Sequence, residues 1–340
     1  MNPANLPPSA EPSSPAIRGE SWSRRQWLAG AAGLMAACNS SSEQPEVSAS
    51  PATDDGLNGR IIDAHVHVWT PDTDRFPISG NYQKSDITPT SFTPEELFAQ
   101  CRPLGVERIN LIQMSFYQDD HRYMLDAIAR YPQNFAGTGL LTDVISRPAQ
   151  PSARMSELAD QGIRAFRLLG GASQRGPRWM DHPNYAALYR LGAERNLALS
   201  FLVNPRDLAE IDRLCEQFPE TPVIIDHLAR LRVDSESLAE DTEALIRLAA
   251  RPRVLVKIGA FYALSASGPP YLDLLPLIER VVTAFGADRC MWESDCPFQV
   301  QPPHSYAASL ALIREQAHFL SAPDKEQILV KTAESHFFSR

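Results

Sequence analysis

The chain has 340 residues and a formal net charge of −9 at pH 7. Its body, residues 59–340, has no basic run, so we expect no nucleic-acid partner. The four cysteines of the body are scattered, which does not fit a disulfide framework in a domain of this size, and we expect mostly buried thiols. A body of about 280 residues suits one large domain or two small ones.

Residues 1–58 carry the signals of an export leader rather than the pattern of a folded domain. Arg24 and Arg25 precede a short apolar run at residues 29–37, and this arrangement resembles a twin-arginine signal. The run is far shorter than the roughly 20 residues that a permanent membrane helix needs. An incidental basic pair in a disordered tail is the alternative.

Cys38 ends a segment that resembles a bacterial lipobox, with Met35 in place of the usual Leu. We expect lipidation of Cys38 or, as the alternative, plain cleavage after a small residue. Residues 39–58 are rich in Ser, Glu, Asp and Pro, which indicates a disordered, solvated tether. We therefore expect export to the periplasm, with a lipid anchor at Cys38 as the only contact with a membrane.

Short apolar runs alternate with amphipathic stretches along the whole body. Continuous apolar runs are typical of strands buried on both faces of a parallel sheet, and the helical period between them indicates helices. Strands are predicted at residues 61–68, 109–115, 136–141, 163–168, 199–203, 222–226, 254–258 and 289–292. Helices are predicted at residues 93–104, 119–131, 151–161, 184–195, 206–217, 238–250, 271–285, 306–316 and 324–337.

Eight strands separated by helices predict a single-domain α/β fold, a (β/α)8 TIM-like barrel, whose catalytic groups lie at the carboxyl ends of the strands. The alternative, an open doubly wound sheet, requires a glycine-rich turn after the first strand. The chain there is Trp69-Thr70-Pro71-Asp72, so the barrel is favoured.

The first strand contains the most informative motif, IDAHVHVW at residues 62–69. Asp63, His65 and His67 alternate along it, and alternate residues of a strand share a face. We therefore expect both imidazoles and the carboxylate to enter one cavity. Neighbouring histidines suit a divalent metal ion. A strand with two incidental histidines is the alternative.

The ends of the second, fourth and sixth strands add further candidates. Gln113 ends the second strand. Arg164 and Arg167 lie three residues apart on the fourth, so they point to opposite faces, and we assign Arg167 to the barrel mouth. His227 ends the sixth strand and shares a face with Ile225. A structural role for this lone histidine is the alternative.

The last two strands lead to Tyr262 and to a carboxylate pair. Tyr262 follows the seventh strand, and the eighth leads to Glu293 and Asp295, which have the same parity. His304 lies in the loop after the eighth strand. The expected substrate contacts are Gln113, Arg167, Tyr262 and His304.

Four motifs occur in order across almost the whole body: IDAHVHVW, GIRAFRLL, VIIDHLAR and the turn Ser294-Asp295-x-Pro297. Together they resemble the amidohydrolase superfamily, in the amidohydrolase-related branch (family 2) that contains aldonolactonases and 2-pyrone-4,6-dicarboxylate lactonase. The resemblance implies a distorted (β/α)8 barrel, in agreement with the strand count.

The resemblance also implies roles for individual residues. His65 and His67 match a pair that binds one divalent metal, for which zinc is expected, and Asp295 matches a general base that is also a ligand in some members. His227 matches a catalytic histidine of the sixth strand, and Arg167 matches an arginine that contacts a substrate oxygen. Catalysis without metal is the alternative, because some lactonases of this branch need none.

The sequence departs from the family pattern at the strand ends. Asn204 stands where strongly metal-dependent relatives carry a histidine, and Glu293 and Cys296 replace the usual Gly and Trp. A ring ester needs little help for its leaving group, so we predict a lactonase for an anionic small molecule, either a sugar-acid lactone or a carboxylated ring. A metal-dependent decarboxylase and a non-catalytic periplasmic binding protein are the alternatives. No pattern indicates an oligomeric state.

Overall fold

Eight parallel strands pair in chain order in the computed structural model, which describes residues 56–57, 59–142, 144–145 and 151–339. They are β1 (Ile61–Val66), β2 (Val106–Ile112), β3 (Phe135–Leu140), β4 (Ala165–Leu169), β5 (Ala198–Leu202), β6 (Val223–Ile225), β7 (Val254–Ile258) and β8 (Cys290–Trp292). The chain after β8 closes the circle, because Asp295 N–H donates to His65 O (3.0 Å) and His67 N–H donates to Cys296 O (2.8 Å). The predicted barrel is confirmed.

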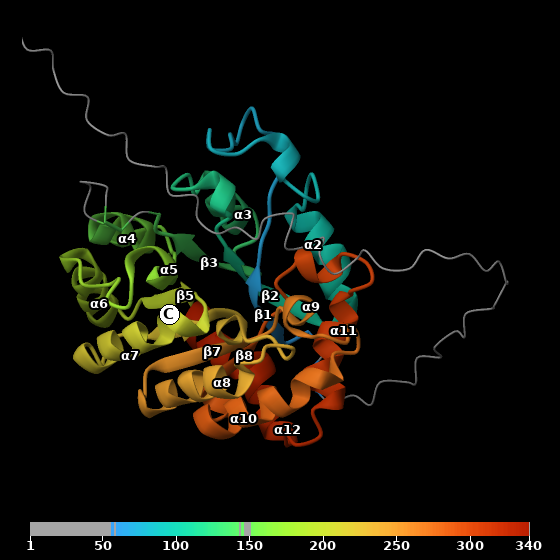
Figure 1. Ribbon diagram of the computed structural model, residues 1–340. Helices are drawn as coiled ribbons and strands as arrows, with labels where there is room; N and C mark the ends of the chain where they lie inside the picture. The colour runs from blue at the N-terminus through green and yellow to red at the C-terminus, as the bar shows by residue number, and fades with distance from the viewer. Residues whose placement is uncertain (1–55, 58, 143, 146–150, 340) are drawn as a thin grey trace, which may run out of the picture. The chain divides into compact units, whose positions relative to one another are not determined.

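Helices follow most strands and lie outside them (Figure 1). They are α2 (Pro94–Cys101), α3 (Arg122–Arg130), α4 (Pro151–Asp160), α5 (Ala172–Arg175), α6 (Pro183–Arg195), α7 (Leu208–Gln217), α8 (Leu238–Arg247), α9 (Phe261–Leu264), α10 (Leu275–Phe285), α11 (Tyr306–Ala311) and α12 (Ala322–Glu326). Neighbouring helices pack together, α4 with α6, α7 with α8 and α8 with α10. Among the described residues, no helix has the length and apolar character needed to cross a bilayer.

The start of α2 illustrates how local sequence sets a helix boundary. Thr93 N–H donates to the Glu96 carboxylate (2.6 Å), and Thr93 Oγ1 accepts from Glu96 N–H (3.4 Å). Pro94 occupies the first helical position, where its missing N–H costs nothing. The leader signals at Arg24, Arg25 and Cys38, by contrast, lie outside the described residues.

Inward-facing side chains form two layers inside the barrel. The lower layer is apolar and consists mainly of Ile62, Ala64, Ala136, Ala165, Ala198, Ile224, Leu255 and Met291, joined by Ala333 and Phe337 from the segment after α12. On four strands the next inward position is charged and buried: Ala165 is followed by Arg167, Ile224 by Asp226, Leu255 by Lys257 and Met291 by Glu293. This second layer lies toward the carboxyl ends of the strands.

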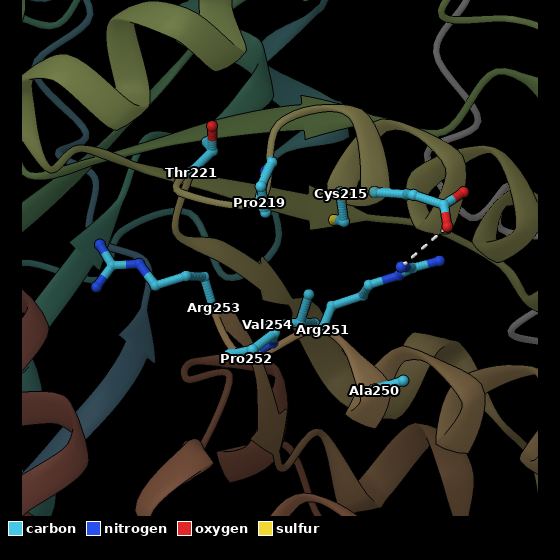
Figure 2. A pocket seen from close by; sticks show the side chains of 9 residues that line it. Cys215, Pro219, Thr221, Ala250, Arg251, Pro252, Arg253 and Val254 are labelled. Atoms are coloured by element: carbon cyan, nitrogen blue, oxygen red, sulfur yellow. Dashed lines mark hydrogen bonds and ion pairs between the residues drawn. The ribbon is translucent and has the colours of Figure 1, made fainter.

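A small pocket of about 80 Å³ lies where β6 and β7 begin (Figure 2). Thr221 precedes β6 and Val254 starts β7, so the pocket belongs to the end of the barrel opposite the charged layer. An ion pair between Arg251 and Glu216 (3.3 Å) borders it. The expected buried thiols are confirmed, since Cys101, Cys215, Cys290 and Cys296 are free and buried.

Candidate active site

A β-bulge in β1 turns both histidines into the barrel. Between the pairs that Asp63 and Val66 form with β2, β1 advances three residues and β2 only two. The extra residue lets Ala64 and His65 both face the interior: Ala64 joins the lower apolar layer, and His65 meets the charged layer. Bulges commonly re-aim side chains beside active sites. His67, two residues on, then faces inward as well.

The prediction that Asp63 shares a cavity with the histidines is wrong. Its carboxylate accepts from the Tyr306 hydroxyl (2.6 Å), Ser294 N–H (3.0 Å) and His65 N–H (3.1 Å). Asp63 therefore faces α11 and ties β1 to the chain after β8. The alternation that put it beside His65 is broken by the bulge.

His65 is fully buried and is contacted at both ring nitrogens. Its Nδ1 lies 2.9 Å from Glu293 Oε2 and 3.2 Å from Lys257 Nζ, and its Nε2 lies 2.7 Å from Arg167 Nη2. A neutral imidazole accepts at one nitrogen only, and the shorter of its two contacts with a cationic donor is the one at Nε2, so Nε2 accepts from Arg167 and the proton is on Nδ1. Burial, followed by the charges of Lys257 and Arg167, lowers the pKa of His65 to about 4.

His67 directs a lone pair of its Nε2 atom toward Nε2 of His65. Its Nδ1 contacts the Ile112 carbonyl (3.0 Å), which can only accept, so the proton is on Nδ1 and Nε2 is unprotonated. This Nε2 lies 3.3 Å from His65 Nε2 and 3.3 Å from Asp295 Oδ1. Burial lowers the pKa of His67, with Asp295 opposing the shift.

His227 enters the site through a left-handed turn. The φ angles of His227, Leu228, Ala229 and Arg230 are 53°, 49°, 53° and 59°. Each such residue costs roughly 1–2 kcal/mol, and strain of this kind persists where the surrounding structure imposes it. Ile225 packs in the outer core. If His227 shared its face, as predicted, the imidazole would point away from the barrel interior. The left-handed turn directs it into the interior instead.

Glu293 holds His227 in place. His227 Nδ1 lies 2.6 Å from Glu293 Oε1, and the two imidazoles of His65 and His227 lie with ring centroids 4.5 Å apart. Burial alone would lower the pKa of His227, but Glu293 and Asp295 raise it above its ordinary value. Burial alone would raise the pKa of Glu293, but His227 and His65 lower it to about 2. Both shifts favour a pair of imidazolium and carboxylate.

Asp295 lies at the centre of the site, three residues beyond β8, with φ of 61°. Its Oδ2 accepts from the Tyr262 hydroxyl (2.7 Å). Its Oδ1 is buried and accepts no hydrogen bond from any described residue. Burial would raise the pKa of Asp295, but the charge of His227 and the proximity of His67 hold it well below its ordinary value. The carboxylate is therefore ionised.

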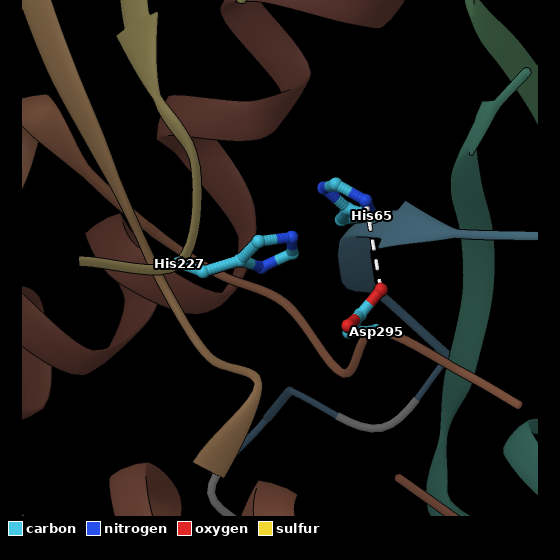
Figure 3. A group of neighbouring side chains, drawn as sticks. All are labelled: His65, His227 and Asp295. Carbon is cyan, nitrogen blue, oxygen red and sulfur yellow. Dashed lines mark ion pairs between the residues drawn. The ribbon is translucent and has the colours of Figure 1, made fainter. Parts of the chain in front are cut away.

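Three atoms with lone pairs thus face one another. The Nε2 atoms of His65 and His67 and the Oδ1 of Asp295 are separated by 3.3, 3.3 and 3.6 Å. A tetrahedral zinc with bonds of about 2.0–2.1 Å holds its ligand atoms about 3.3–3.4 Å apart. Figure 3 shows His227 pointing toward His65 and Asp295, with ligand atoms of these three within 4.8 Å of one another. The donor set fits a divalent metal.

Arg167 joins a buried ion network beneath His65, whose other members, Asp226 and Lys257, were not among the predicted site residues. Lys257 Nζ lies 3.0 Å from Asp226 Oδ1, and Arg167 Nη2 lies 3.2 Å from Asp226 Oδ2. Burial would raise the pKa of Asp226, but Lys257 and Arg167 lower it. A signal was present in the sequence, because Lys257 interrupts the otherwise aliphatic run Val254–Ile258.

The other predicted residues have identifiable partners. Arg167 faces inward, as predicted. The Gln113 amide donates to the carbonyls of Gln118 (3.2 Å) and Asp120 (2.8 Å), so it holds the loop after β2. His304 is half-buried, with Nδ1 2.9 Å from the Tyr271 hydroxyl. Substrate contact by Gln113 and His304 stays a prediction.

A (β/α)8 barrel with two histidines and an aspartate at the carboxyl ends of its strands is the arrangement of a barrel hydrolase. The chain belongs to the amidohydrolase family, whose model matches residues 62–338.

Two lactone hydrolases and one solved amidohydrolase structure are among the proteins similar to this chain. The chain is 28% identical over 283 residues to L-fucono-1,5-lactonase of Burkholderia ambifaria, covering 82% of this chain and 94% of that one. It is 26% identical over 239 residues to 4-sulfomuconolactone hydrolase of Rhizobium radiobacter, covering 69% of this chain and 75% of that one. A zinc-bound amidohydrolase structure from Burkholderia multivorans has the same fold, with a TM-score of 0.68, 21% identity, and coverage of 82% of this chain and 98% of that one.

Proposed function

We propose that this protein hydrolyses a lactone of a sugar acid or of a carboxylated ring. The observation that carries the proposal is the ionised Asp295, whose Oδ1 has no donor among the described residues and faces two neutral imidazoles. The named activities of similar proteins, which act on lactones, support the same class of reaction.

The chemistry has to compensate for a weak base. A general base works best when its pKa lies near the working pH, and the pKa of Asp295 lies far below it. The water must therefore be made more acidic, or the carbonyl more electrophilic. A divalent metal, zinc in our proposal, held by His65, His67 and Asp295, would supply both effects when bound.

The side chains divide the remaining steps. Asp295 Oδ1 takes a proton from water while the water oxygen bonds to the lactone carbonyl carbon. Arg167 steadies the oxyanion, and its Nε is a buried donor without a partner among the described residues. The ring C–O bond then breaks, and the leaving oxygen takes a proton from the imidazolium of His227, which Glu293 holds by Nδ1. Asp295 then returns its proton through solvent to His227, which restores both groups, and the new acid leaves as a carboxylate after it releases one proton to solvent.

Charge at the mouth supports an anionic substrate. Of the arginines beyond β4, Arg178 is paired with Asp181 (2.7 Å). Arg175 donates instead to the neutral hydroxyl of Tyr185 (3.1 Å) and forms no ion pair with a described residue. The decarboxylase alternative lacks similar support, because no histidine follows β5 and Asn204 N–H donates to Asp207 Oδ2 (3.0 Å) at the start of a turn.

A panel of lactones tests the proposal. The panel contains aldonolactones, and muconolactones and pyrones that carry carboxylate or sulfonate groups. Asp295→Asn keeps the shape of the side chain and removes the base, so kcat/KM should fall by roughly 100- to 10,000-fold on any lactone that wild type opens. No turnover by wild type, or undiminished turnover by the variant, would reject lactone hydrolysis, and release of carbon dioxide without ring opening would identify a decarboxylase.

Export is proposed on the sequence signals alone. Arg24→Lys with Arg25→Lys should keep the full-length precursor in the cytoplasm. Cys38→Ser should move the mature protein from the membrane fraction to the soluble periplasm, and mass spectrometry of the mature amino terminus distinguishes lipidation from plain cleavage. A wild-type protein that keeps residues 1–58 would contradict the proposal.

A further inference from the structure

Arg167 places its guanidinium on a lone pair that a metal would need. Its Nη2 lies 2.7 Å from His65 Nε2, and the side chain is buried. With the proton of His65 on Nδ1, beside Glu293, Nε2 holds the only lone pair of the ring. A lone pair that accepts a hydrogen bond from Arg167 cannot bind a metal at the same time.

Other members of the charged layer hold the guanidinium in this position. Arg167 Nη2 also contacts Asp226 Oδ2 (3.2 Å). Asp226 is fixed in turn by Lys257 Nζ (3.0 Å) and by the Ser200 hydroxyl, which donates to Oδ1 (2.8 Å). Asp226, Ser200 and Lys257 are all fully buried. The contact with His65 is therefore part of a packed network and not the excursion of a surface arginine.

The balance of buried charges also opposes a metal ion beside Arg167. The site buries three carboxylates, Asp226, Glu293 and Asp295, beside the permanent cations Arg167 and Lys257. A divalent ion would add two more charges next to Arg167, and like charges in a poorly solvated interior repel strongly.

We propose that Arg167 is an internal cation that competes with a divalent metal for Nε2 of His65 and thereby sets the metal affinity of the site. Metal entry requires the guanidinium to leave Nε2 while it keeps its contact with Asp226. The proposal concerns cation binding only, so it stands or falls independently of lactone hydrolysis.

The test is the Zn²⁺ dissociation constant of the purified protein, measured by competition with a chromophoric chelator. Arg167→Met should bind Zn²⁺ at least tenfold more tightly than wild type. Arg175→Met is the matched control, because it removes the same charge from the mouth without touching His65, and it should change the affinity less than twofold. General damage to the site would loosen the ligands and weaken binding, so only removal of a competitor explains a gain.

A second pair of variants covers the case in which Arg167→Met folds poorly. Asp226→Asn removes the carboxylate that would be left unpaired, and the double variant R167M/D226N has the same net charge as wild type. The double variant should bind Zn²⁺ more tightly than D226N, and its Co²⁺ form should gain the visible absorption expected when a further histidine nitrogen becomes a ligand. Equal or weaker Zn²⁺ binding after removal of Arg167, in either background, would overturn the proposal.

Discussion

The two inward layers of the barrel come from the same strands and differ by a shift of two residues along each. Ala165, Ile224, Leu255 and Met291 fill the lower layer, and Arg167, Asp226, Lys257 and Glu293 fill the upper one. Regular strand geometry suffices for the lower layer. The bulge in β1, the left-handed turn at His227 and the positive φ of Asp295 all occur at the level of the upper layer or beyond it.

This difference separates two tasks that compete for the same interior. Apolar burial stabilises the fold, whereas each buried charge carries a desolvation cost that only good partners offset. The lower layer should therefore determine stability, and the upper layer should affect both stability and activity.

The largest effect is expected from removing one charge of the upper layer. Lys257→Met leaves Asp226 with Arg167 as its remaining cation, and breaking a buried pair in this way costs about 3–5 kcal/mol of unfolding free energy. Urea denaturation measures the loss. Leu255→Met, one layer below, is a volume-conserving control that should cost less than about 1.5 kcal/mol. Equal losses would erase the difference between the layers.

A deletion in the lower layer should affect stability alone. Phe337→Ala removes a buried ring from the apolar cluster and should lower the unfolding free energy by about 3 kcal/mol. The folded variant should keep kcat/KM within twofold of wild type, measured well below its melting temperature. Phe338→Ala, at the partly buried edge of the same cluster, should cost less. A parallel loss of activity would show that the two layers are coupled.

The loss of unfolding free energy in acid should come from groups at the carboxyl end of the barrel. His121 Nε2 accepts from Leu140 N–H (3.0 Å) at the end of β3, and burial, followed by the charge of Arg154, lowers its pKa to about 4. The unfolded histidine titrates near 6.5, so the unfolded chain takes up a proton first as the pH falls. The native state should therefore lose about 2 kcal/mol between pH 7 and pH 5 through His121.

His121→Gln removes that contribution. The unfolding free energy of the variant should decline less than that of wild type between pH 7 and pH 5, even if the variant is less stable at pH 7. The same decline in both proteins would assign the acid sensitivity to other groups.

The smallest effect is expected from one hydroxyl. Tyr262→Phe removes the hydrogen bond to Asp295 Oδ2, and a bond to a charged group is worth about 1.5 kcal/mol, so kcat/KM should fall roughly tenfold on a substrate lactone. Tyr271→Phe, whose hydroxyl contacts His304 instead, should have a weaker effect. If the two variants are equally active, Tyr262 does not support the carboxylate during catalysis.

The regular parts of this fold were predictable from the sequence, and the irregular parts were not. Strand β7 was predicted to the residue, because a strand buried on both faces is a continuous apolar run. Alternation also placed Arg167 inward. These inferences need only local geometry.

Asp63 and His227 show where local geometry fails. The bulge next to Asp63 accompanies bonds to Ser294 and Tyr306, more than two hundred residues away in the chain. The left-handed turn at His227 is held by Glu293, which comes from another strand. No pattern within either strand contains that information, whereas the lysine in the aliphatic run of β7 was a local signal that was not used.

The residues that fill the base of the barrel, Ala333 and Phe337, follow all eight strands in the chain. A nascent polypeptide that has already released every strand from the ribosome still has an open interior until those two side chains emerge. A chaperone that engages the chain between these two stages therefore meets a barrel whose base lacks two of its apolar side chains.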